Sequence, residues 1–251
     1  MSIPAGYERL LQPHAVAIAR SDLIPSIRQA LIAPDGVRST LYDFAARSNG
    51  ARALQGRGTA YATRLPAGPR VVVRHNRHGG LFARFTGDRF LAPTRAPREL
   101  EVSLALRARG IATPEIVAYV LYPPGGVFQR ADVASLEVPA GRDLTDVLAR
   151  ETGDARKLAL RAAAQLVVAL ADVGARHHDL NARNVLIAGT EAFVLDLDRV
   201  SLGQARAAAL EGNLARLTHS LRKSRERVGL AVSDAEIETL EKRARGRGAA
   251  G

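Results

Sequence analysis

The sequence predicts an α+β fold of two lobes, an N-terminal antiparallel β-sheet lobe with one helix and a mainly helical C-terminal lobe. Two observations carry this prediction. Residues 51–138 contain β-branched runs separated by Pro/Gly turns, which is typical of strands. Beyond residue 139 the chain is dominated by Ala- and Leu-rich segments with helical spacing. Pro139-Ala140-Gly141 is the expected hinge between the two lobes.

The same patterns predict the limits of the domains. Residues 1–50 are expected to form an extension that packs on the small lobe and carries a single short helix at 41–47. The small lobe, residues 51–138, precedes the helical lobe at 139–245. The last segment, 246–251, is rich in Gly, Ala and Arg and is expected to be disordered.

In the small lobe, alternating residues on either side of a Pro/Gly turn predict a hairpin. A Pro at the first turn and a Gly stop predict one helix, and two apolar runs about a Pro-Pro-Gly-Gly turn predict further strands. The expected elements are strands at 59–65, 71–73, 116–121 and 127–138 and a helix at 97–109.

In the helical lobe, apolar residues at helical spacing predict four helices. A short apolar pair of segments about a Gly turn predicts a hairpin between the second and third of them. The expected elements are helices at 144–150, 155–173, 205–227 and 234–245 and strands at 184–187 and 192–197.

Composition excludes several classes of protein. The chain has no Cys, which rules out disulfides and thiolate chemistry. It shows neither a secretory signal nor an apolar run long enough to cross a bilayer, so a soluble or peripheral protein is expected. The net charge is +11, and Lys occurs only at positions 157, 223 and 242. Codon usage explains such an Arg bias as well as an anionic partner does, and charge alone does not choose between nucleotide, glycolipid, membrane and nucleic acid.

Three polar residues of the helical lobe have the spacing that phosphoryl transfer requires. Asp179 follows a long helix, Asn184 lies five residues later, and Asp196 follows a short apolar strand. In kinases the first carboxylate receives the proton of the attacking hydroxyl, while the amide and the second carboxylate hold Mg²⁺. We therefore expect Asp179 as the catalytic base, Asn184 and Asp196 as metal ligands, ATP and Mg²⁺ as cofactors, and a two-lobed protein-kinase-like fold.

His177 and His178 precede the expected base. Neither a Cys nor an HExxH pattern supports a zinc site. We expect His177 to be a packed, hydrogen-bonded support for the loop.

The small lobe supplies the expected nucleotide-binding residues. Gly56 and Gly58 form a Gly-x-Gly turn before a strand pair, where backbone N–H groups can face phosphates. Arg74 ends a Val-rich strand where a kinase carries its phosphate-binding Lys, and this lobe contains no Lys. Glu99 on the following helix is the expected partner of Arg74, with Glu101 in reserve.

The chain resembles the Kdo/lipopolysaccharide kinase family over roughly residues 50–225. The HHDLN motif marks kinase-like enzymes in general, whereas RHNRHGGL and NLARL…SLRK are more specific. The matching segments are GRG at 56–58, VVRHNRHGGL at 72–81, TRAPRE at 94–99, VFQRAD at 127–132, HHDLNARNVLI at 177–187, VLDLDR at 194–199 and NLARLTHSLRK at 213–223.

The resemblance implies ATP-dependent phosphorylation of a Kdo (3-deoxy-D-manno-octulosonic acid) hydroxyl, the 4-position, on Kdo-lipid IV(A) during lipopolysaccharide core assembly. It places the protein at the cytoplasmic face of the inner membrane, in peripheral contact with anionic lipid, without nucleic acid or an obligate protein partner. Asp179 falls on the catalytic Asp of the family.

Three other classes of protein remain possible on the sequence alone. A small-molecule kinase of the aminoglycoside-phosphotransferase type shares the loop, although such kinases commonly read HGD. A protein kinase is disfavoured because Leu-Asp, and not Phe-Gly, follows Asp196. A non-catalytic basic binding protein is disfavoured by the retained Asp179 and Asn184 and by an aromatic content of 4%.

Overall fold

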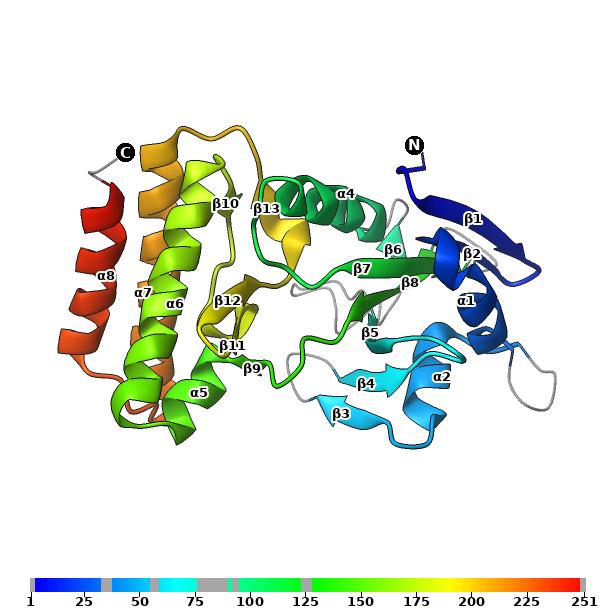
Figure 1. The fold of residues 1–251 in the computed structure, drawn as a ribbon, viewed down its shortest axis with the longest axis horizontal. Coiled ribbons are helices and arrows are strands. Elements are labelled where there is room, and N and C mark those ends of the chain that lie inside the picture. Colours follow the sequence, from blue (N-terminus) through cyan, green and yellow to red (C-terminus); the bar gives the residue numbers. More distant parts are fainter. Residues whose placement is uncertain are drawn as a thin grey trace. The chain divides into compact units, whose positions relative to one another are not determined.

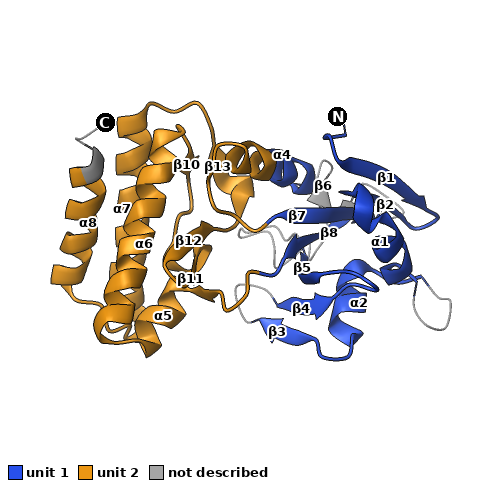
Figure 2. Cartoon of the chain, in the orientation of Figure 1, with its two compact units in different colours: residues 1–101, 115–137 blue, residues 102–114, 138–251 orange. Residues whose placement is uncertain are grey.

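The computed structural model describes residues 3–32, 38–54, 59–75, 90–91, 95–122 and 128–248. The chain divides into two compact units (Figure 2), which are described separately. Unit 1 comprises residues 1–101 and 115–137, and unit 2 comprises residues 102–114 and 138–251. Helix α4 (Ala96–Arg107) begins in unit 1 and ends in unit 2.

Unit 1 is built on an antiparallel sheet, as the sequence predicts (Figure 1). Its strand order is β1-β2-β7-β8-β5-β4-β3, with β6 paired to β8. The strands are β1 (Tyr7–Gln12), β2 (Ala15–Arg20), β3 (Arg52–Leu54), β4 (Ala60–Arg64), β5 (Arg70–His75), β6 (Phe90–Leu91), β7 (Ile116–Tyr122) and β8 (Phe128–Leu136).

The first fifty residues contain more structure than the single short helix expected for them. That helix is present as α2 (Leu41–Arg47), but β1, β2 and α1 (Ile24–Ala30) precede it. Strand β2 pairs with β7, about a hundred residues later in the chain, and this joins residues 7–20 to the main sheet. Strands β1 and β2 also pair with each other across a two-residue turn, a local hairpin that the sequence analysis missed; only the pairing of β2 with β7 is remote in sequence.

Helices α1 and α2 share a core with one face of the sheet. Because side chains alternate along a strand, Val71 and Val73 on β5 and Val120 on β7 point to the same side. They pack with Ile27 of α1 and Leu41 of α2, and all five are fully buried.

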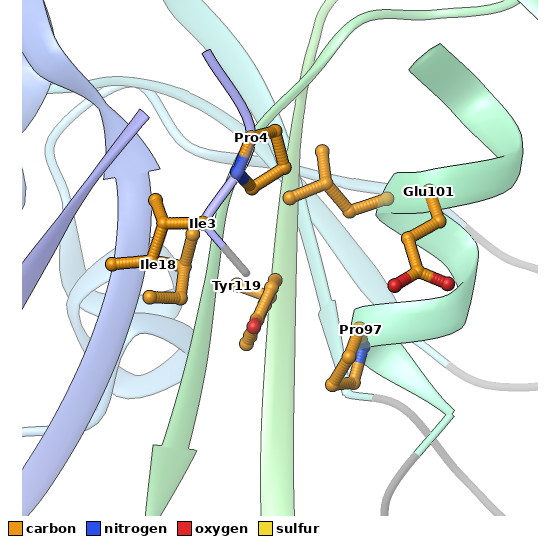
Figure 3. A pocket seen from close by; sticks show the side chains of 7 residues that line it. Ile3, Pro4, Ile18, Pro97, Glu101 and Tyr119 are labelled. Atoms are coloured by element: carbon orange, nitrogen blue, oxygen red, sulfur yellow. The ribbon is translucent and has the colours of Figure 1, made fainter. Parts of the chain in front are cut away.

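On the other face, the beginning of α4 packs over β2 and β7 (Figure 3). Ile18 and Tyr119 are register partners on these strands and line a small pocket with Pro97 and Glu101 of α4. Burial, with the nearby Glu101 carboxylate, raises the pKa of Tyr119. The pocket includes none of the residues expected to bind nucleotide.

A fully buried carboxylate, Asp132 on β8, organises the helical side of unit 1. Its Oδ2 accepts hydrogen bonds from the Tyr42 amide at 2.9 Å and the Tyr122 hydroxyl at 2.8 Å. Its Oδ1 lies 2.6 Å from Nδ1 of His75, whose ring stacks on Tyr42. The Tyr122 hydroxyl in turn accepts from the Leu41 amide at 2.7 Å. The first turn of α2 is therefore fixed to the sheet through one buried side chain.

Replacing Tyr122 by Phe should lower the free energy of unfolding by about 1–3 kcal/mol, because the Leu41 amide and Asp132 each lose a buried partner. Urea titration measures the change. The control is Tyr119→Phe, since no hydrogen bond links the Tyr119 hydroxyl to another residue in the part of the chain that the structure describes. Equal stability of the two variants would contradict the role given to the Asp132 cluster.

Unit 2 is mainly helical, as predicted, and α6 lies at its centre (Figure 1). Leu160, Leu166 and Leu170 of α6 are buried against α5, α7 and α8, and its Ala residues allow close approach of these helices. The helices are α5 (Leu144–Arg150), α6 (Gly153–Asp172), α7 (Arg206–Val228) and α8 (Asp234–Gly248), the last continuing three residues beyond its predicted end. None of the helices in the described ranges has the length and apolar character needed to cross a membrane.

Two small sheets complete unit 2. One has the order β12-β11-β9 and the other pairs β10 with β13. The short elements are β9 (Arg142–Asp143), β10 (Arg176–His177), β11 (Val185–Ala188), β12 (Glu191–Val194), β13 (Val200–Ser201) and the 3₁₀ turns η2 (Ala182–Asn184) and η3 (Leu197–Arg199).

Candidate active site

The expected base, Asp179, lies in the loop between β10 and η2 of unit 2. Its backbone is held on both sides. The amide donates to Nδ1 of His177 at 3.1 Å, and the carbonyl accepts from the side-chain amides of Asn181 at 3.1 Å and Asn184 at 2.9 Å. Since these contacts occupy the backbone groups, the half-buried carboxylate is left to project from a rigid loop.

His177 is the support that the sequence predicts for this loop. It is fully buried, and its Nδ1 must be unprotonated because it accepts from the Asp179 amide. The proton therefore resides on Nε2, which donates to the carbonyl of Leu195 at 2.9 Å. Burial lowers the pKa of His177, so the ring is neutral. One neutral imidazole thus ties the loop of Asp179 to the residue before Asp196.

Asn213 on α7 completes this support, and sequence reasoning missed it. Its side-chain oxygen accepts from the His177 amide at 2.8 Å, and its nitrogen donates to the Ala175 carbonyl at 2.9 Å. It is fully buried. The sequence does contain one sign of this role: Asn213 is a polar residue on the face of the helix that is otherwise apolar.

The expected metal ligands, Asn184 and Asp196, flank the β11–β12 hairpin. Val185 opposes Val194 in the ladder, and the Leu195 amide donates to the Asn184 carbonyl at 2.9 Å. The predicted hairpin therefore brings the two ends together as expected. Asp196 has left-handed backbone angles, φ 62° and ψ 54°, which cost a non-Gly residue free energy, and residues held in such conformations cluster at active sites.

The donor set at these two residues fits Mg²⁺. The Asn184 nitrogen is used on the Asp179 carbonyl, so the side-chain oxygen is the atom left for a cation. Magnesium prefers oxygen ligands and takes one or two from protein, with phosphates and water filling the rest. In the described ranges no group of three or more His, Asp or Glu residues could hold a metal ion by itself.

Arg216 on α7 contacts the expected base directly and was not predicted. Its guanidinium lies 2.7 Å from Oδ1 of Asp179 and is about half exposed. Arg216 belongs to the segment NLARLTHSLRK. It lies 37 positions after Asp179 in the chain, so the sequence pattern does not predict that the two residues touch. The ion pair fixes the direction of the Asp179 carboxylate.

In unit 1 the structure joins Arg74 to Glu99. Arg74 is at the end of β5, and its guanidinium forms an ion pair with the carboxylate of Glu99 in the first turn of α4. Glu99 is almost completely buried, whereas Arg74 is about one-third exposed. The reserve partner, Glu101, is exposed and lines the pocket of Figure 3. Gly56 and Gly58 lie outside the described residues.

Known proteins resemble this chain in sequence and in fold. Two 3-deoxy-D-manno-octulosonic acid kinases are similar to the chain. The one from Vibrio vulnificus (strain YJ016) is 30% identical over 194 residues, covering 74% of this chain and 78% of that protein. The one from Stenotrophomonas maltophilia (strain K279a) is 31% identical over 175 residues, covering 68% of each. A solved structure, "WaaP in complex with acyl carrier protein", has a similar fold, with a TM-score of 0.50, 16% identity and 78% coverage of both chains.

These similarities make the chain a phosphotransferase that acts on a hydroxyl group, with the kinase-like fold predicted from its sequence. The model of the lipopolysaccharide kinase (Kdo/WaaP) family matches residues 45–242. The chain therefore belongs to that family, and its membership implies the use of ATP.

Acidification should weaken the fold through His177. Its pKa is lower in the folded protein than the ordinary value of about 6.5. Below that pH the unfolded chain binds more protons than the folded chain, so the free energy of unfolding falls as pH decreases. The variant His177→Gln lacks the ionisable group and should lose less stability between about pH 7 and pH 5. Urea unfolding across this range measures both slopes, and parallel slopes would show that His177 is not held neutral.

Proposed function

We propose that the protein transfers the terminal phosphoryl group of ATP to the 4-hydroxyl of Kdo on Kdo-lipid IV(A), in the assembly of the lipopolysaccharide core. The observation that carries the proposal is the hydrogen-bonded frame formed by His177, Asn184 and Asn213 around Asp179. The Kdo kinases that resemble the chain support the choice of acceptor.

In this proposal Asp179 acts as the base. Its carboxylate accepts a hydrogen bond from the acceptor hydroxyl, orients the oxygen towards the phosphorus, and takes the proton as the new O–P bond forms. The leaving group is ADP, and the proton passes from Asp179 to solvent. The rigid backbone of the loop keeps the carboxylate in place, which contributes to rate through positioning.

Asn184 and Asp196 would hold Mg²⁺, which when bound neutralises charge on the nucleotide phosphates. Arg74, fixed by Glu99, would hold the phosphates from unit 1, with backbone N–H groups of Gly56 and Gly58 as further donors. Residues 51–138 would then serve as the nucleotide-binding lobe and 139–245 as the catalytic lobe. An Arg supplies a planar, permanently charged fork where other kinases use the point charge of a Lys.

We also place the protein at the cytoplasmic face of the inner membrane as a peripheral enzyme. The acceptor is an anionic glycolipid, and a net charge of +11 favours contact with an anionic surface. Nucleic acid and an obligate protein partner have no part in this proposal.

Incubation with Mg·ATP and Kdo-lipid IV(A), followed by mass analysis of the lipid, tests the function. One added phosphate on the 4-hydroxyl of Kdo is the expected product. Transfer to an aminoglycoside or a protein in place of the lipid would overturn the proposal.

The variant Asp179→Asn should lower kcat by about 10²–10⁴-fold, because the amide orients a hydroxyl poorly and cannot take its proton. Its unfolding midpoint should remain close to that of the wild type, since the backbone contacts of residue 179 do not use the carboxylate and its ion pair with the half-exposed Arg216 contributes little to stability. Wild-type turnover in this variant would show that another group is the base.

Arg74→Ala should raise KM for ATP by about 10–100-fold, the equivalent of losing one charged hydrogen bond of roughly 1.5–3 kcal/mol. Arg74→Lys should recover part of this, because it restores the charge but not the fork. Arg64→Ala on the neighbouring strand β4 is the matched control and should leave KM for ATP unchanged. An unaltered KM in Arg74→Ala would remove Arg74 from the nucleotide site.

A further inference from the structure

One face of α7 extends from the expected base into a cluster of cations. Arg216, Ser220, Lys223 and Arg227 follow one another at intervals of three or four residues, so they lie along the same side of the helix. The helix rises 1.5 Å per residue, which puts Lys223 about 10 Å and Arg227 about 16 Å from Arg216 along its axis.

The near end of this face is attached to the loop of Asp179. Arg216 forms its ion pair with the Asp179 carboxylate at 2.7 Å, and one turn later the Ser220 hydroxyl accepts from the Ala182 amide at 3.1 Å. Two contacts on successive turns fix the direction of the helix relative to the loop. A ligand that binds at Asp179 and extends along α7 therefore lies beside the cations at a defined distance from Arg216.

The far end of the face is a surface depression with an excess of positive charge. It is lined by His219, Arg222, Lys223, Glu226 and Arg227, all of them exposed. We refer to this set as the α7 basic groove. It holds three permanent cations against one carboxylate.

The cations of the groove are only partly neutralised by neighbours. Arg222 contacts Glu241 of α8 at 3.2 Å. Within the described part of the chain, no ion pair or hydrogen bond joins Lys223 or Arg227 to another side chain. Like charges held close together on one helix face repel, so this arrangement costs stability and favours binding of an anion.

We propose that the α7 basic groove binds a phosphate monoester carried by the acceptor glycolipid, about 10–16 Å along α7 from Arg216, the residue that pairs with Asp179. This inference rests on the proposed function, because it requires the acceptor hydroxyl to lie at Asp179. Phosphate oxygens accept strong hydrogen bonds from ammonium and guanidinium groups, and an exposed groove suits a headgroup that must enter from a lipid surface. The groove therefore selects acceptors that already carry a phosphate at this distance.

The test compares Lys223→Glu/Arg227→Glu with Lys242→Glu/Arg243→Glu. Both double variants make the same change of charge near the end of an exposed helix, but the second pair lies on α8 outside the groove. The groove variant should bind fluorescent Kdo-lipid IV(A) at least about tenfold more weakly and show a matching rise in KM, with the effect on KM and not on kcat. The α8 variant should bind like the wild type. Equal binding by the groove variant and the wild type would overturn the proposal.

Two further experiments identify the ligand that the groove binds. With an acceptor whose phosphates have been removed enzymatically, the wild type and the groove variant should bind equally well. A defect that persists with this acceptor would contradict recognition of phosphate. A defect limited to sedimentation with phosphatidylglycerol vesicles, without change in acceptor binding, would assign the groove to bulk membrane lipid and overturn the proposal.

The binding measurement also separates this proposal from the function it rests on. Failure of the wild type to phosphorylate Kdo-lipid IV(A) would refute the proposed function, while lipid binding by the two variants would still decide the groove. Turnover by the wild type, with wild-type affinity in the groove variant, would refute the groove alone.

Discussion

The arrangement of unit 2 depends on the hydrogen bonds of one neutral histidine. His177 receives the amide of Asp179, donates to the carbonyl of Leu195, and has its own amide held by Asn213. These contacts join β10, the loop after it, the end of the hairpin and α7. A charged ring would turn the acceptor Nδ1 into a second donor facing an N–H group, so the low pKa of His177 and the geometry of the loop require each other.

Asn184 connects this hydrogen-bonded support of the Asp179 loop to the residues expected to hold the metal ion. Its side-chain amide holds the Asp179 carbonyl, and its own carbonyl holds the amide of Leu195. A single residue therefore couples the expected base to the left-handed turn of Asp196. The Leu195 amide beside Asp196 is bound to the Asn184 carbonyl, and the Asp196 carbonyl accepts from the Arg199 amide at 3.4 Å, so the surroundings stabilise the strained backbone of Asp196.

Sequence patterns were sufficient for what is local. The limits of α2 and α5 match their predicted residues, and the hairpin after Asn184 follows from its Gly turn and apolar flanks. Contacts between residues that lie far apart in the sequence could not be predicted from these patterns. Strand β2 joins the main sheet by pairing with β7, and Arg216 reaches Asp179 from a helix whose register is set by tertiary packing. The pair Arg74 and Glu99 is an intermediate case, since their pairing was predicted from the kinase pattern and not from any local signal, and the ion pair forms through the packing of a strand and a helix that were predicted separately.

The use of Arg74 in a lobe without Lys has a chemical consequence. A guanidinium stays protonated throughout the pH range in which proteins fold and is a poor nucleophile, whereas an amine at the same place is open to acylation. The only side-chain amines of the chain belong to Lys157, Lys223 and Lys242, all in unit 2. An acylating reagent would therefore find no lysine to modify in unit 1, and of the three lysine amines only that of Lys223 lies in the α7 basic groove.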